Sequence, residues 1–104
     1  MSEINQLEAW LAQEREVIAR LDAGAGPGVA RPEQIAGMSG LQMMEAMLRG
    51  DLPYAEIART LSFQIIEVSP GRALFQGTPQ PEHRNPMGGI HGGWYATLLD
   101  SALG

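Results

Sequence analysis

Residues 61–78 place the tightest limit on the fold of this chain, because they have the pattern of two strands joined by a tight turn. The first segment, 61–68, is rich in β-branched and aromatic residues, and the second, 73–78, alternates weakly between apolar and polar residues. Pro70 and Gly71 stand between them at the two central positions of a four-residue turn. The pattern predicts an antiparallel pair of strands.

Helical patterns lie on both sides of this strand pair, so the predicted fold class is α+β. In residues 1–22, apolar side chains recur at helical spacing, which predicts an amphipathic helix that packs on the domain or on a second subunit. Ser39 and Gln42 have the spacing of a capping box, and Gly50 stands where a helix C-cap is expected. A further helical pattern runs from about residue 90 to residue 103.

The composition divides the chain into three parts. Residues 23–38, rich in Gly, Ala and Pro at their start, are predicted to be a linker between the first helix and a domain over residues 39–104. Within that domain, residues 54–60 are predicted to add one or two helical turns, and residues 79–86 a polar loop. His83 lies in this loop between two charged residues and is predicted to be solvated.

Composition and charge exclude several classes of protein. The 104 residues include no cysteine, which rules out disulfides, zinc-thiolate sites and a cysteine nucleophile. A net charge of −5 with no run of basic residues argues against nucleic acid and anionic membranes as partners. No apolar stretch approaches the roughly 20 residues that span a bilayer. Glu3 and Glu8 stand where a signal peptide would be basic and then apolar. We therefore expect a cytoplasmic protein.

The segment Asn85–Asp100, NPMGGIHGGWYATLLD, is a glycine-rich entry into a helix. Its glycines allow a substrate to approach the backbone closely. The first N–H groups of a helix have no intrahelical acceptor and lie at the positive end of its dipole. A carbonyl oxygen that gains negative charge during a reaction would be stabilised there. A phosphate site is an alternative reading, although the segment lacks both the G-K-[ST] and the G-x-G-x-x-G patterns.

Three side chains of this segment are chemically informative. Asn85 can add a side-chain N–H, and His91 can orient the loop or donate a hydrogen bond. Asp100 stands among leucine and alanine residues, where a carboxylate is costly to bury without a partner or a purpose. Taken singly, a histidine or a helical aspartate is more often structural than catalytic.

Taken together, N-P-x-G-x-x-H-G-G followed by T-L-L-D resembles the phenylacetate-degradation (PaaI-type) branch of the hotdog-fold thioesterases. The strand–turn–strand and the helix over residues 39–49 also fit that branch, so the resemblance covers residues 39–104. It implies a hotdog fold, in which an antiparallel sheet wraps around a long central helix and two such units pair. We expect the sequence to be truncated after the start of that helix, with further strands in the complete protein.

The resemblance implies a role for each residue of the motif. Asn85 would hold the thioester carbonyl or the catalytic water, and His91 would position Asn85 and the loop. The Gly92 N–H would polarise the carbonyl, and Asp100 would be the general base or the nucleophile. The positions expected to contact substrate are Gly88, Gly89, Gly93 and Trp94. Of these, Gly89 replaces a common threonine, and Trp94 is bulkier than usual and could alter the pocket.

The implied reaction is hydrolysis of an aryl- or medium-chain acyl-CoA to a carboxylate and CoA, without a metal or a redox cofactor. Two alternatives remain open: a non-hydrolytic hotdog protein that binds acyl-CoA or acts as a dehydratase, and an inactive fragment of either. We expect the 104-residue chain alone to be inactive.

Helix geometry predicts a homo-oligomer independently of the resemblance. Gly92 and Asp100 are eight residues apart, which is about 12 Å along a helix axis. A donor and a base that act on one carbonyl must each lie within about 3 Å of it, or one water further. An antiparallel second helix, related by two-fold symmetry, could supply its Asp100 to the first chain. The predicted sites therefore combine Asn85 and Gly92 of one chain with Asp100 of another.

Overall fold

The computed structural model describes residues 3–104; Met1 and Ser2, which the sequence placed in the first helix, lie outside the described residues. The predicted α+β class is confirmed. The elements in chain order are α1 (Glu3–Ala23), α2 (Pro32–Ile35), α3 (Gly40–Arg49), α4 (Glu56–Thr60), β1 (Phe63–Ser69), β2 (Arg72–Gly77), the 3-10 turn η1 (Pro81–His83) and α5 (Gly92–Leu103).

Strands β1 and β2 pair antiparallel, as predicted, and the turn between Ser69 and Arg72 closes the hairpin. Gly71 in that turn has a φ of 71°, which glycine adopts without strain. A β-bulge interrupts the register between Ile65 and Glu67. The first four residues of β1 are all buried, so neighbouring elements cover both faces of this part of the strand.

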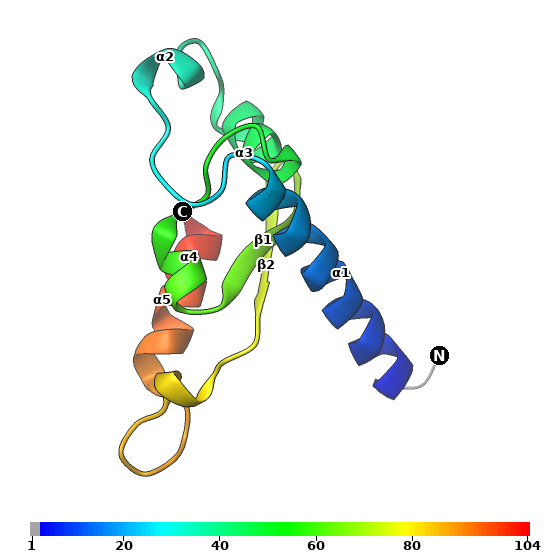
Figure 1. Ribbon diagram of the computed structural model, residues 1–104, viewed down its shortest axis with the longest axis vertical. Helices are drawn as coiled ribbons and strands as arrows, with labels where there is room; N and C mark the ends of the chain where they lie inside the picture. Colours follow the sequence, from blue (N-terminus) through cyan, green and yellow to red (C-terminus); the bar gives the residue numbers. More distant parts are fainter. Residues whose placement is uncertain (1–2) are drawn as a thin grey trace.

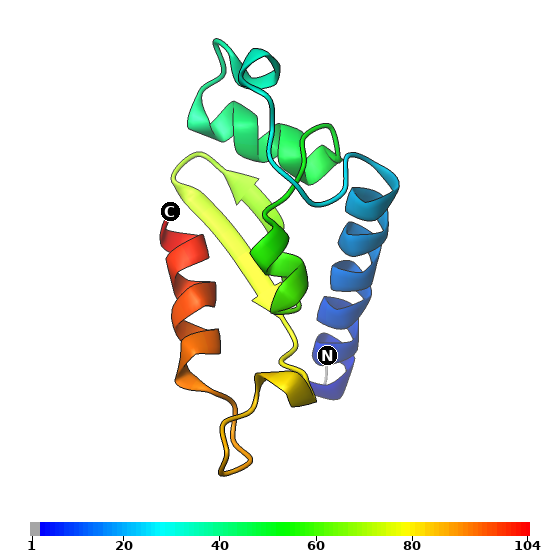
Figure 2. The same cartoon turned by 60° about the vertical axis from the view of Figure 1, so that its left-hand side comes forward.

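The helices surround the hairpin. Helices α1, α3 and α4 contact β1, whereas α5 contacts β2. The hairpin therefore lies between α1 on one side and α5 on the other, and α3 crosses the end of the hairpin that carries the turn (Figure 1, Figure 2). Among the described residues, no helix is both long enough and apolar enough to cross a bilayer.

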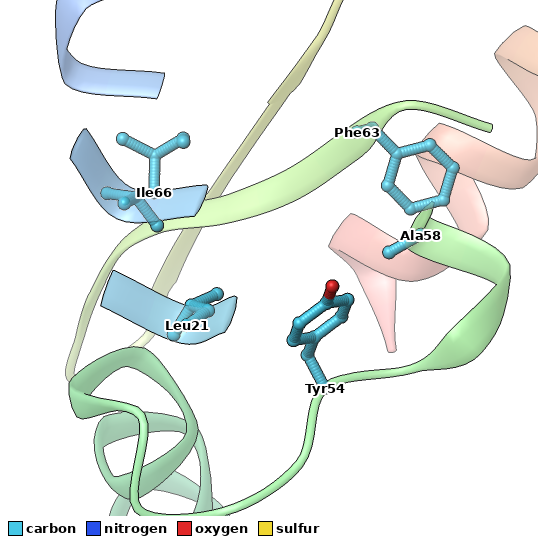
Figure 3. Close-up of a cluster of buried hydrophobic side chains, with 6 residues drawn as sticks. Leu21, Tyr54, Ala58, Phe63 and Ile66 are labelled. Atoms are coloured by element: carbon cyan, nitrogen blue, oxygen red, sulfur yellow. The ribbon is translucent and has the colours of Figure 1, made fainter. Parts of the chain in front are cut away.

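The main core forms where α1, α4 and β1 meet. Tyr54 lies between Leu21 of α1 and Ala58 of α4, and Phe63 and Ile66 of β1 complete the cluster with Val17 (Figure 3). The Tyr54 hydroxyl donates to Asp22 Oδ1 at 2.6 Å. Burial, together with this hydrogen bond, raises the pKa of Tyr54 to about 12.

Helix α1 packs on the domain through its second half. Val17 and Leu21 are buried, and Glu14 is buried beside them with its Oε2 accepting from Gln76 Nε2 at 2.8 Å. Most large apolar residues of the first half are exposed, Ile4 by 70%, although Leu11 is half-buried. The apolar spacing located the helix correctly, but about half of its apolar residues lie outside the core. The other exposed apolar residues of α1 are Leu7, Trp10 and Ile18.

The segment predicted as a linker is fixed to the domain. It contains α2, which the sequence did not predict, and its backbone bonds to residues 50–54. Ala25 N–H donates to Gly50 O at 2.9 Å, and Gly28 N–H donates to Tyr54 O at 2.9 Å. At Gly24 a Cβ would come within 2.4 Å of Gly50 O, so this close approach requires glycine.

The caps of α3 are as predicted. Ser39 Oγ accepts from the Gln42 N–H at 3.1 Å, and the Ser39 N–H donates to Gln42 Oε1 at 2.8 Å. Gly50 ends the helix in the left-handed conformation, with a φ of 88°. Helix α4 supplies the further helical turn expected in residues 54–60.

Candidate active site

The glycine-rich segment before α5 forms a closed loop, which we call the glycine loop (residues 84–91). A β-bridge between Arg84 and Ile90 closes its base. Inside it, the Asn85 N–H donates to Gly89 O at 2.7 Å, and the Gly88 N–H donates to Asn85 O at 3.0 Å. Gly88 makes the turn with a φ of 91°. The loop projects beyond the hairpin (Figure 2), and its internal bonds define its conformation.

Asn85 is oriented by the loop backbone. Its Oδ1 accepts from the Met87 N–H at 2.9 Å and from the Gly89 N–H at 3.2 Å. Because both partners are donors, the oxygen must face the loop, and the Nδ2 amide is left as the outer half of the group. No acceptor for Nδ2 is found among residues 3–104. The Nδ2 group of Asn85 is therefore available to donate a hydrogen bond to a ligand.

His91 caps α5. Its Nδ1 accepts from the Gly93 N–H at 2.8 Å, which requires an unprotonated Nδ1 and places the proton of the neutral ring on Nε2. Its backbone N–H donates to His83 O at 2.8 Å. No hydrogen bond joins His91 to Asn85 within the described residues, so the expected action of His91 on Asn85 stays a prediction. His91 orients the end of the loop directly, through its own hydrogen bonds to Gly93 and His83.

Gly92 opens α5, two residues later than the start that the sequence pattern suggested. The Gly93 N–H is taken by His91, but the Gly92 N–H has no acceptor in the part of the chain that the structure describes. A Cβ at Gly92 would meet no atom within 4 Å, so the surroundings of this N–H are open. A helix N-terminus with a free, accessible N–H can bind a partly negative oxygen.

Asp100 is exposed, so it is not embedded among apolar neighbours in the single chain as its sequence context suggested. Its carboxylate has no hydrogen-bond or ionic partner among residues 3–104. It lies eight residues after Gly92 in the 12-residue α5, and therefore about 12 Å along the axis. Around it, large apolar side chains are also uncovered: Leu99 is 60% exposed and Leu103 is 87% exposed.

Trp94, which the resemblance placed in contact with substrate, is buried in the single chain. It is 5% exposed, and its Nε1 donates to Leu61 O at 2.6 Å. The edge of its ring system meets Tyr95 in a T-shaped contact with centroids 5.4 Å apart. Three of the four expected contact positions, Gly88, Gly89 and Gly93, are exposed around the loop and the helix start.

His83 is the functional candidate that the sequence reasoning missed, and the prediction that it is solvated is wrong. It is 7% exposed, its Nδ1 accepts from the Gln80 N–H at 2.9 Å, and its Nε2 lies 2.9 Å from Thr60 O. Pro81 begins the turn η1 that brings Gln80 and His83 together. The Gln80–His83 spacing around a proline resembles a helix-capping signal, which could have revealed the turn.

Asn85, Gly88 and Gly89 thus lie together in the glycine loop, and Gly92 begins the helix directly after it. Asp100 lies eight residues further along α5. A cleft between α1 and α4, lined by Leu11 and Arg59 among others, includes none of these residues. Within residues 3–104, no three His, Asp or Glu side chains are grouped so that they could hold a metal ion.

Comparison of the chain with protein-family models, with curated proteins and with solved structures gave no match.

Proposed function

We propose that this chain belongs to a hotdog-fold thioesterase that hydrolyses aryl- or medium-chain acyl-CoA to a carboxylate and CoA. The observation that carries the proposal is the presence of two donors, Asn85 Nδ2 in the glycine loop and the Gly92 N–H at the start of α5, which have no acceptor among residues 3–104. Donors held ready for an oxygen that gains charge are the central requirement of acyl-transfer catalysis. The resemblance of the surrounding motif to PaaI-type thioesterases indicates that the substrate is a thioester.

In the proposed reaction the thioester carbonyl oxygen accepts from Asn85 Nδ2 and from Gly92 N–H. Asp100 removes a proton from a water molecule while the oxygen of that water adds to the carbonyl carbon. The two donors stabilise the resulting oxyanion. The oxyanion collapses and the carbon–sulfur bond breaks. The protonated Asp100 returns its proton to the thiolate of CoA, and the carboxylic acid product ionises in solvent. Direct attack by the Asp100 carboxylate, followed by hydrolysis of the anhydride, is the other route that the motif allows.

We further propose that the Asp100 of each site comes from a second copy of the chain. In one α5 the carboxylate and the Gly92 N–H are about 12 Å apart, too far to act on one carbonyl. The α5 surface that carries Asp100 is exposed together with Tyr95 and Leu99, which supplies apolar area for a two-fold contact. In this arrangement α5 is the central helix, and the β1–β2 hairpin is part of the sheet that wraps it.

The first experiment replaces Asp100 with asparagine in the longest natural form of the protein that contains these residues. We expect thiol release from phenylacetyl-CoA and decanoyl-CoA to fall by roughly 100-fold or more, the usual effect of losing a general base. Asp51→Asn is the matched control, because Asp51 is an exposed carboxylate that pairs with Arg49 at 3.0 Å, away from the loop. Undiminished turnover in Asp100→Asn would contradict the assignment of Asp100 as the catalytic carboxylate. Binding of acyl-CoA without thiol release by the unaltered protein would favour the non-hydrolytic alternative.

A second experiment tests whether two chains share each site. Asn85→Asp keeps the oxygen that the Met87 and Gly89 N–H groups require and replaces the Nδ2 donor with a carboxylate oxygen, which cannot donate to the carbonyl. Asn85→Asp and Asp100→Asn should each be inactive alone. A mixed dimer contains one site with both residues intact, so co-refolding equal amounts should restore about a quarter of the normal activity. A mixture as inactive as its components would show that each site lies within one chain.

A further inference from the structure

The two ends of the glycine loop are attached to neighbouring peptide groups at the end of α4. His83 precedes the loop, and its Nε2 lies 2.9 Å from Thr60 O. Trp94 follows the loop, and its Nε1 donates to Leu61 O at 2.6 Å. The two acceptors are thus consecutive carbonyls. We call residues 60–62, which include them, the α4 anchor.

The direction of the His83 bond follows from its partners. The Gln80 N–H donates to Nδ1 at 2.9 Å, so Nδ1 is unprotonated, and a carbonyl oxygen can only accept. Nε2 must therefore carry the proton and donate to Thr60 O. The backbone oxygen of His83 also accepts from the His91 N–H at 2.8 Å. One buried residue consequently fixes the start of the loop and, through His91, its end.

The third residue of the anchor shows that this junction is held against its own conformational preference. Ser62 has a φ of 56°, and it is the one non-glycine residue among residues 3–104 with a positive φ. That conformation is unfavourable for an L-residue, so the surroundings must maintain it. The Ser62 carbonyl accepts from the Thr78 N–H at 3.1 Å, which ties the end of β2 to the same anchor.

We propose that His83 and Trp94 are positioning residues of the candidate site, which hold the glycine loop between them so that Asn85 and Gly92 keep their relative placement. Both side chains are buried, so water cannot easily replace the lost hydrogen bonds. The catalytic consequence rests on the proposed thioesterase function, whereas the effect on the loop itself does not. A displacement of about 1 Å at such a site can reduce turnover by roughly 100-fold.

A matched set of variants separates the individual bonds. His83→Gln can still donate to Thr60 O but loses the acceptor for Gln80, and His83→Asn keeps that acceptor but cannot reach Thr60. Trp94→Phe keeps an aromatic ring in the same space and removes the donor to Leu61. The proposal predicts that the glutamine variant is closest to the unaltered protein, because it keeps the bond to the anchor.

Amide hydrogen exchange is the first measurement, and it does not depend on catalysis. The Gly88 and Asn85 N–H groups, which bond inside the loop, should exchange about tenfold faster in His83→Asn and Trp94→Phe, and by less than about threefold in His83→Gln. The Met43 N–H in α3 serves as an internal control and should not change, because it bonds to Ser39 O, apart from the loop. Unchanged loop exchange in His83→Asn and Trp94→Phe overturns the proposal.

Steady-state hydrolysis of phenylacetyl-CoA is the second measurement. His83→Asn and Trp94→Phe should lower kcat by roughly 10- to 100-fold with KM changed by less than about threefold, and His83→Gln should recover most of the loss. If the unaltered protein hydrolyses thioesters and these variants keep full kcat, the positioning role is overturned while the function stands. If the unaltered protein releases no thiol but loop exchange responds as predicted, the function fails while the positioning role is supported.

Discussion

Glu14 is a carboxylate that is buried in the core side of α1, and its Oε2 is satisfied by Gln76 Nε2 at 2.8 Å. Among the described residues, no buried side-chain nitrogen or oxygen lacks a partner. That result is expected, because each unpaired buried polar group costs roughly 1–3 kcal/mol. The Asn85 Nδ2 and Gly92 N–H donors, which have no acceptor among the described residues, are not buried, so a ligand can reach them.

Tyr54→Phe should reduce stability at neutral pH by about 1 kcal/mol, because it removes the hydroxyl that donates to Asp22 and leaves the ring in place. The pKa of Tyr54 is raised from 10.0 to about 12 in the folded protein, so the folded state holds its proton more tightly. This contribution is complete below pH 10 and is lost between about pH 10 and 12. Stability should fall more steeply over that interval in the unaltered protein than in the variant.

Urea unfolding at neutral pH and at several alkaline pH values measures both effects. Tyr95→Phe is the control, because Tyr95 is half-exposed and its ring contact with Trp94 survives the change. Equal alkaline slopes in Tyr54→Phe and in the unaltered protein would contradict the role of Asp22 and burial.

At the scale of secondary-structure elements, the sequence predicted the features that depend on residues close together in the chain, such as helix caps and turns. The cap of α3 was visible because Ser39 bonds to Gln42, only three residues away, and the hairpin was visible because its turn lies within four residues. The burial of His83 depends on Thr60, which is 23 residues away, and no local pattern records such a contact. The apolar spacing of α1 likewise located a helix but could not show which apolar residues the rest of the chain covers.

The same division applies to the candidate site. The glycine-rich entry into α5 follows from adjacent residues, so the motif predicted it. The cap by His91 is equally local, but the motif did not predict that its Nδ1 accepts from the Gly93 N–H. The orientation of Trp94 toward Leu61, 33 residues away, and the exposure of Asp100 depend on how α5 lies on β2. Packing between distant segments determines both the burial of Trp94 and the exposure of Asp100. The spacing of residues within the motif carries no information about that packing.

Gly77→Ala tests how closely β1 and β2 approach at the end of the hairpin. A Cβ at Gly77 would come within 2.5 Å of Phe63 Cβ and 2.6 Å of Ser62 O. One of those atoms is backbone, so the strands must separate, and we expect a loss of about 2–3 kcal/mol in unfolding free energy. Gly40→Ala is the matched control: it lies in the first turn of α3 with no atom within 4 Å. It should be neutral or slightly stabilising. Urea unfolding compares the two, and equal stability would contradict the close approach.

At the scale of the whole molecule, the chain is more extended than a typical domain of its length. Its radius of gyration is 14.7 Å, whereas about 13 Å is expected for a compact domain of this size. The difference agrees with the projection of α1 and the glycine loop away from the hairpin (Figure 1). Apolar side chains remain uncovered on α1 and α5, including Trp10 and Leu99. We propose that a second copy of the chain covers the exposed apolar residues of α5.

Leu99→Lys should weaken self-association, because it places a charge in the exposed apolar face of α5 that the proposed two-fold contact would bury. We expect the dimer dissociation constant to rise at least about tenfold, which corresponds to roughly 1.4 kcal/mol. Val29→Lys is the control: it also replaces an apolar residue, 86% exposed, but lies in the segment between α1 and α2. Sedimentation velocity over a range of concentrations measures the change. A protein that is monomeric throughout, or a Val29 variant that dissociates as readily, would contradict this use of α5.

The α4 anchor also has a consequence for the order in which the molecule assembles. Its contacts to His83 and Trp94 span 23 and 33 residues of sequence, and contacts between distant segments form slowly because the intervening chain must first be confined. We therefore expect β1 and β2, which are neighbours in sequence, to pair before the glycine loop acquires its two attachments. During synthesis on a ribosome, the caps of α3 can form while the chain is still emerging, whereas the candidate site cannot be complete until Trp94 has left the exit tunnel.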